Sequence, residues 1–95
     1  MTNIPDATHD AAASVFQIDT AHGKALLRYV ERNGVLDLVH TEVPEVLEGQ
    51  GYGSALARAA LSHARKEGKK IIPSCPFVTA YLKRHPADAA LVVRG

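Results

Sequence analysis

The sequence predicts a single small α/β (α+β) domain with a mixed, mostly antiparallel sheet and two helices, in the order β-β-β-α-β-α(-β). Three observations predict this fold class. Strand-like segments separated by turns fill the first half, a helical period follows a glycine-rich stretch at residues 49–53, and a short apolar strand and a proline-initiated helix come last. Because a strand after a crossover helix runs parallel to the strand before it, only that pairing is expected to be parallel.

Chain length and composition indicate one folded unit. Its 95 residues lie well below the size at which chains divide into separate cores, and 46% hydrophobic with 22% charged residues is typical of globular proteins. Residues 1–13 show neither a strand nor a helix period, so we expect a flexible tail there and the domain at residues 14–95. A formal net charge of +1 supplies no excess of cations for binding nucleic acid.

Cysteine and histidine content bears on compartment and metals. Cys75 is the sole cysteine and so cannot form an intramolecular disulfide, and residues 1–13 lack the basic and apolar segments of a secretion signal. We therefore expect a cytoplasmic protein. No apolar run approaches the roughly 20 residues that cross a membrane. His9, His22 and His63 lack the spacing of metal ligands, so no metal is expected.

The strand pattern is clearest around one predicted hairpin. Residues 14–20 alternate as a strand with one buried face. Residues 24–32 and 35–43 then flank Asn33-Gly34, which is a strong hairpin signal because both turn positions accept positive φ. The sequence therefore predicts a three-stranded meander.

The second arm of the hairpin carries the first candidate residues. Regular alternation divides it into two faces, one with Leu36, Leu38, His40 and Glu42 and the other with Val35, Asp37, Val39, Thr41 and Val43. We therefore expect His40 and Glu42 to emerge side by side.

Two helices with a strand between them follow the meander. Residues 51–67 carry a stripe of small and apolar side chains and are followed by Gly68, a typical helix end; the stripe comprises Gly53, Leu56, Ala57, Ala60, Leu61 and Ala64. Residues 69–74 read as a strand. Pro76 opens a helix at residues 77–85.

In this second helix, Phe77, Ala80 and Tyr81 share one face, and Pro86 marks its end. Residues 91–93 predict a last short strand.

The glycine-rich stretch predicts an anion cradle at a helix N-terminus. Free backbone N–H groups point outward there, and glycines at positions 49, 51 and 53 leave room for a diphosphate. The Walker loop is excluded because Gly53 is followed by Ser54-Ala55, and the spacing G-x-G-x-x-G of dinucleotide-binding folds does not occur.

A Gly-x-Gly that opens an amphipathic helix after a meander resembles the acetyl-CoA loop of the GNAT superfamily of N-acetyltransferases. The chain resembles the small single-domain members from about residue 14 to residue 86. Four short motifs carry this resemblance: His40-Thr41-Glu42-Val43-Pro44, Gly49-Gln50-Gly51-Tyr52-Gly53, Pro73-Ser74-Cys75-Pro76-Phe77 and Arg84-His85-Pro86. The resemblance implies a minimal GNAT fold whose central parallel strands splay apart, and transfer of an acetyl group from acetyl-CoA to a primary amine.

The resemblance also implies which residues hold the coenzyme. These are Val43, Gly49, Gln50, Gly51, Tyr52, Gly53, Ser54 and His85. Glu48 departs from the family, which has Gln or Arg at this position, and a carboxylate beside a diphosphate is repulsive unless it points into solvent.

Four side chains are candidates for the chemistry. Cys75 precedes Pro76 at a helix N-terminus, where the helix dipole favours a thiolate; it is either an acetyl acceptor, a polar group near the thioester, or a buried apolar side chain. His40 or Glu42 could accept the proton of the amine. Alternatively, His40 makes a structural hydrogen bond and Glu42 is solvated. Tyr81 could protonate the departing thiolate, as in many GNAT enzymes, or pack in the core.

Two other classes of function remain open. A noncatalytic module could keep the cradle to sense acyl-CoA or dock a partner, and a purely structural domain would not bind the coenzyme. The acceptor is also open among small amines, peptide N-termini and protein lysines.

Overall fold

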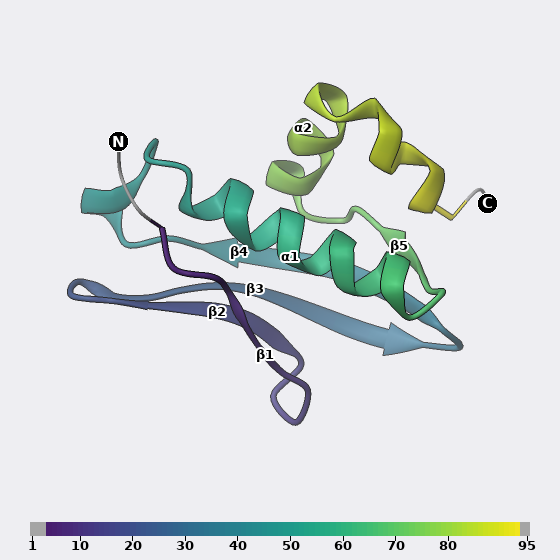
Figure 1. Cartoon of the computed structure of the whole chain (residues 1–95), viewed down its shortest axis with the longest axis horizontal. Helices are drawn as coiled ribbons and strands as arrows, with labels where there is room; N and C mark the ends of the chain where they lie inside the picture. The colour runs from purple at the N-terminus through teal and green to yellow at the C-terminus, as the bar shows by residue number, and fades with distance from the viewer. Residues whose placement is uncertain (1–3, 94–95) are drawn as a thin grey trace.

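The computed structural model describes residues 4–93 and confirms a mixed α/β domain built on one five-stranded sheet (Figure 1). Its strands lie in the order β1-β2-β3-β4-β5, antiparallel except for β5, which runs parallel to β4. The elements are β1 (Thr8–Asp10), β2 (Val15–Thr20), β3 (Gly23–Arg32), β4 (Val35–Glu42), the 3-10 turn η1 (Glu45–Leu47), α1 (Tyr52–Lys66), β5 (Lys70–Ile72), α2 (Pro76–Arg84) and the 3-10 turn η2 (Pro86–Leu91).

The expected flexible tail is wrong from residue 8 onward, while residues 1–3 lie outside the described part of the chain. β1 pairs with β2 through His9 and Phe16, whose rings also stack with centroids 4.3 Å apart. Three residues are too few to show a period in the sequence. These residues form a strand because they pair with β2, in which Phe16 lies seven positions after His9.

The hairpin between β3 and β4 is confirmed. Asn33 and Gly34 both have positive φ, at 52° and 76°, and Arg32 pairs with Val35 across the turn. The two strands thus adopt the register that the Asn-Gly turn predicts.

One inserted residue in β4 changes the expected faces of this strand. Arg28 pairs with His40 but the next residue, Tyr29, pairs with Leu38, so Val39 is a bulge. A bulge reverses the alternation beyond it. The helix-side face therefore continues from Leu36 and Leu38 to Thr41 and Val43, which line a pocket with the start of α1. The predicted placement of His40 and Glu42 on the face of Leu36 and Leu38 is wrong.

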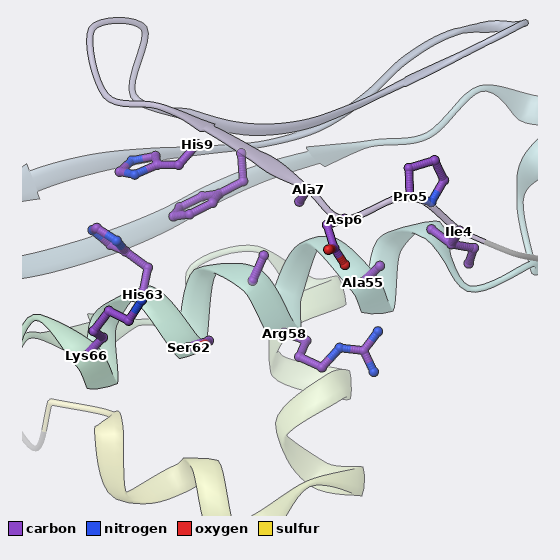
Figure 2. A pocket seen from close by; sticks show the side chains of 12 residues that line it. Ile4, Pro5, Asp6, Ala7, His9, Ala55, Arg58, Ser62, His63 and Lys66 are labelled. Atoms are coloured by element: carbon purple, nitrogen blue, oxygen red, sulfur yellow. The ribbon is translucent and has the colours of Figure 1, made fainter.

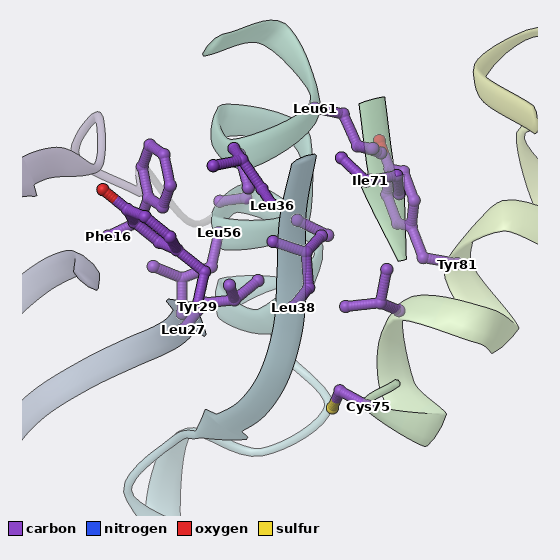
Figure 3. Close-up of a cluster of buried hydrophobic side chains, with 14 of the residues drawn as sticks. Phe16, Leu27, Tyr29, Leu36, Leu38, Leu56, Leu61, Ile71, Cys75 and Tyr81 are labelled. Carbon is purple, nitrogen blue, oxygen red and sulfur yellow. The ribbon is translucent and has the colours of Figure 1, made fainter. Parts of the chain in front are cut away.

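The core lies between the sheet and α1, and both α-helices cover the same face of the sheet (Figures 1 and 3). The predicted stripe on α1 is confirmed, since all of its members are buried: Gly53, Leu56, Ala57, Ala60, Leu61 and Ala64. These short side chains let the helix approach β2 and β3 closely. Among residues 4–93, no helix is long and apolar enough to cross a membrane.

The C-terminal part differs from the prediction in two respects. The buried face of α2 consists of Val78, Tyr81 and Leu82, whereas Ala80 is exposed. The cause is the docking of the N-cap, where the Cys75 N–H donates to the Leu38 carbonyl at 2.8 Å and orients the helix. In place of the predicted last strand, η2 ends in a single bridge between Val92 and Ile71.

The bulge predicts opposite outcomes for two neighbouring truncations. Leu38→Ala removes a fully buried side chain and should lower the free energy of unfolding by about 2–5 kcal/mol. Val39→Ala, at a side chain that is 38% exposed, should cost less than about 1 kcal/mol. Urea unfolding followed by circular dichroism measures both, and equal losses would contradict the assignment of Val39 as the inserted residue.

Candidate functional site

A pocket of about 470 Å³ opens at the N-terminus of α1, between the end of β4 and the start of α2. It is lined by Thr41, Val43, Leu47, Glu48, Gly49, Gly51, Tyr52, Gly53, Ser54, Phe77 and Arg84. The pocket thus brings the glycine-rich stretch together with residues of the motifs at residues 40–44 and 84–86, although residues 41 and 84 lie far apart in the sequence.

Backbone N–H groups at the start of α1 are available to a ligand. Gly51 is the N-cap, no side chain caps the helix, and its first turn closes with Ala55 N–H donating to the Gly51 carbonyl at 3.0 Å. The N–H groups of Tyr52, Gly53 and Ser54 therefore have no partner within the helix. They lie at the positive end of the helix dipole, which suits an anion.

Gln50 does not belong to this set of free amides. Its backbone N–H donates to the Leu47 carbonyl at 3.2 Å, and its side-chain amide donates to the Val46 carbonyl at 3.2 Å. Its side chain is exposed and is absent from the pocket lining of the described chain. Gln50, which the family resemblance assigns to the coenzyme site, therefore has its backbone N–H already occupied, and the free amides begin after it.

The three glycines serve different physical needs. Gly49 and Gly51 have φ values of 80° and 101°, which residues with a side chain rarely adopt. At Gly53, an added Cβ would lie 2.6 Å from Cζ of Phe77, so any side chain here would force the Phe77 ring to move from its place on the helix. The sequence predicted that Gly53 belongs to the buried stripe of the helix and clears the approach of a diphosphate, but it did not predict the contact with Phe77.

The charged side chains of the pocket are Glu48 and Arg84. Glu48, the residue that departs from the family pattern, does line the cavity. Arg84 is not among the residues that the sequence predicts for the coenzyme site, although it belongs to one of the four motifs. The spacing of seven residues between Phe77 and Arg84 could have indicated that both line the pocket, because two helical turns place both side chains on one face of α2.

Cys75 is the N-cap of α2 and lies directly behind the pocket wall. Its side chain is 6% exposed, and its Sγ shares a hydrogen bond of 3.3 Å with Oγ1 of Thr41, which does line the pocket. Burial alone would raise the pKa of the thiol. Hydrogen bonds from Thr41 and from the backbone N–H groups of Phe77 and Val78 outweigh burial, so the pKa is lowered.

His40 and Glu42 meet as predicted, but away from the pocket. His40 Nε2 lies 3.2 Å from Glu42 Oε1, and both side chains are more than half exposed. They project from the face of β4 opposite to Thr41. The bulge at Val39 thus gives the strand a pocket on one side and an imidazole–carboxylate pair on the other.

Tyr81 and His85 form a separate pair on α2. Their rings stack with centroids 4.0 Å apart, and neither belongs to the pocket lining among the described residues. Figure 3 shows Tyr81 pointing towards Leu61 and Ile71 in the core. Burial, with Asp88 next in effect, raises the pKa of the Tyr81 hydroxyl. Within residues 4–93, no group of three or more His, Cys, Asp or Glu residues is placed to hold a metal.

Comparison with known proteins gives consistent matches. Residues 15–91 match the family described as GCN5-related N-acetyl-transferase. Protein NATD1 of Gallus gallus is 34% identical over 82 residues, which cover 82% of this chain and 74% of that protein, and Protein NATD1 of Homo sapiens is 34% identical over 82 residues, covering 82% and 72%. The solution structure of a protein from Staphylococcus aureus, described as GCN5-like, superimposes with a TM-score of 0.73 and 29% identity over 98% of this chain and 91% of that one.

The contact between Gly53 and Phe77 predicts a substitution whose sign depends on its background. Gly53→Ala should destabilise the protein by about 1–3 kcal/mol, because the new methyl group overlaps the Phe77 ring. In a Phe77→Ala background the same change should be neutral or stabilise by up to about 1 kcal/mol, because alanine favours the helix. Urea unfolding of the four proteins gives the coupling, and an equal loss in both backgrounds would refute the packing role.

The environment of Cys75 predicts that its thiol titrates below the ordinary cysteine range. Thr41→Val should raise this pKa, because the thiolate loses a hydrogen-bond donor. Thr79→Val is the matched control, since the Thr79 hydroxyl donates to the Pro73 and Cys75 carbonyls and not to the thiol. Ultraviolet absorbance of the thiolate reports on this sole cysteine, and equal shifts in both variants would argue against Thr41.

Proposed function

Because the chain belongs to the GCN5-related N-acetyltransferase family, we propose that it binds acetyl-CoA and transfers the acetyl group to a primary amine. The observation that carries this proposal is the set of free N–H groups of Tyr52, Gly53 and Ser54 at the mouth of the pocket. A diphosphate matches these donors in charge and in number of acceptor oxygens.

The other residues of the pocket support binding of the coenzyme with its diphosphate at the start of α1. Arg84 supplies a guanidinium for a phosphate group, while Val43, Leu47 and Phe77 offer apolar surface to the pantetheine arm. Ladder pairing between β4 and β5 ends at Asp37 and Ile72, and the Cys75 N–H still bonds the Leu38 carbonyl beyond it, so the arm would lie further along, between the end of β4 and α2. Gly49 and Gly51 have no side chains that would obstruct the coenzyme. We assign no direct contact with the coenzyme to Gln50 or His85.

Transfer requires one bond to form and another to break. The amine must first lose its ammonium proton, because a lysine-like amine of pKa about 10.4 is mostly charged at neutral pH. Its nitrogen then attacks the thioester carbonyl, the C–N bond forms, and the C–S bond breaks. The coenzyme leaves as a thiolate that takes up a proton. The nitrogen gives up a second proton as it becomes an amide, so two protons leave the amine in all: one is returned to the coenzyme thiolate and the other is released to water.

Cys75 is the side chain best placed for this chemistry. Its lowered thiol pKa and its position behind Thr41 support a thiolate close to the thioester. In direct transfer it acts as a polar group that exchanges the proton. In the covalent route its sulfur takes the acetyl group first and passes it to the amine, which would give parallel lines in double-reciprocal plots.

The remaining candidates take lesser parts in the proposal. The exposed His40–Glu42 pair could attract a cationic amine to the open face of β4, but this face lies opposite to the pocket, so we assign the pair no direct proton transfer at the thioester. Tyr81 is directed to the core, so we assign it to packing. A reduced thiol suits the cytoplasm, where we expect the protein to act.

A noncatalytic acyl-CoA-binding module is the second candidate. The observation that favours it is Glu48, whose carboxylate lines the pocket and would oppose a diphosphate. Such a module would bind the coenzyme without releasing free coenzyme A in the presence of amines.

Thermal unfolding with acetyl-CoA tests the proposed function. A ligand at 100 times its Kd should stabilise the folded protein by about 2.7 kcal/mol. Arg84→Gln should weaken binding by about tenfold or more, because a charge-assisted hydrogen bond is lost. Lys83→Gln, an exposed neighbour outside the pocket lining, is the matched control.

The outcomes separate the classes of function. Absence of any stabilisation would refute coenzyme binding. Stabilisation together with coenzyme A release on adding a panel of amines supports the transferase, and stabilisation without release supports the noncatalytic module.

A further inference from the structure

A second cavity, of about 530 Å³, lies on the side of α1 away from the candidate site (Figure 2). Residues 4–10, which we call the strap, run across α1 and form one wall of this cavity. The other wall is the exposed surface of the helix, with Arg58, Ser62, His63 and Lys66. The strap therefore bridges the helix over open space instead of packing on it along its whole length.

One end of the strap is held by His9. Its ring stacks on Phe16 with centroids 4.3 Å apart and an interplanar angle of 9°, and its Nε2 shares a hydrogen bond of 2.7 Å with the Tyr29 hydroxyl. The ring also meets the edge of His63 on α1, with centroids 4.4 Å apart. His9 is thus the residue through which β1 contacts β2, β3 and α1 at once.

The other end of the strap touches the N-cap of α1. Cδ1 of Ile4 lies 3.2 Å from the position that a Cβ on Gly51 would occupy. Ile4 and Ala7 are partly buried against the core. The strap therefore connects the His9 cluster to the backbone at which the candidate site begins.

The charges around His9 come from three directions. Lys69 after α1 is the nearby cation and the imidazole of His63 on α1 adds positive charge only when protonated, while Asp10 on β1 and Glu31 on β3 are the nearby anions. Lys69 and Glu31 form an ion pair at 2.7 Å. Burial first, then His63 and Lys69, lower the pKa of His9 against the opposing effect of the two carboxylates.

The sign of the pH dependence follows from this lowered pKa. Once released into water, His9 regains an ordinary pKa of about 6.5 and binds a proton more readily than in the docked state. The docked strap is therefore fully stable above that pH and loses stability as the pH falls through the ordinary histidine range.

We propose that residues 4–10 form a pH-responsive cover: protonation of His9 releases the strap from β2 and α1, opens the cavity beside the helix and withdraws Ile4 from Gly51. Protonation of His9 opposes docking of the strap because the ring is shielded from water where it packs on Phe16 and because His63 lies against it. Release of the strap needs no coenzyme, so this proposal stands or falls independently of the proposed function.

Hydrogen exchange of the full chain, followed by NMR from pH 7.5 to pH 5.5 and corrected for intrinsic exchange rates, tests the proposal. Protection of the β1–β2 amides should fall by up to about tenfold by pH 5.5, because this pH lies about one unit below the pKa of the released His9. The Gly51 amide resonance should shift over the same range. The β3–β4 amides should stay protected, which separates release from global unfolding.

Variants identify the group responsible. His9→Gln keeps a polar side chain that can reach Tyr29 and should remove the pH dependence, whereas His22→Gln, in an exposed turn, should leave it unchanged. His63→Gln should reduce the loss of protection, because the neighbouring imidazole is gone. Constant β1 protection across this pH range in the natural protein, or an unchanged loss in His9→Gln, would overturn the proposal.

Discussion

The inserted residue in β4 is the constraint on which the site depends. Before Val39 the strand presents Leu36 and Leu38 to α1, and after it the strand presents Thr41 and Val43 to the same side. A regular strand would turn these two residues to the open face and bring an exposed imidazole and carboxylate towards the helices. The bulge thus lets one strand build the core with its first half and a pocket wall with its second.

The same region fixes the start of α2. Leu38 is the last core residue before the bulge, and its carbonyl accepts the Cys75 N–H, so the N-cap of the second helix is tied to the strand where the alternation changes. Thr41 then meets the Cys75 sulfur. Hydrogen bonding, rather than a charged neighbour, is what offsets the burial of this thiol.

The sequence predicted the elements well where the signal is local. The Asn33-Gly34 turn and the small-residue stripe of α1 each follow from residues close together in the sequence, and the direction of the strand after Gly68 follows from the helix that precedes it. The glycine-rich loop was likewise found from its own pattern, although Gln50 lies outside the free amides because the Leu47 carbonyl occupies its N–H. Such features depend little on the rest of the chain.

The features that the sequence did not predict depend on contacts between distant segments. β1 exists because Phe16 lies beside His9, and the buried face of α2 follows from its tie to Leu38. The bulge at Val39 leaves no trace in a pattern of alternating residues, so Thr41 was assigned to the wrong face. Arg84 was missed for a different reason, because its role depends on a pocket whose other wall belongs to α1.

The parallel pairing of β4 with β5 has a consequence for how the protein assembles. The hairpin joins neighbours along the chain, whereas Val35 meets Lys70 only after α1 has crossed the sheet. Contacts of long sequence separation form late, so we expect the meander to fold first and α2 to dock last. Because α2 supplies Phe77 and Arg84, the pocket is completed in the final step, and partial detachment of this helix would open it while the meander stays intact.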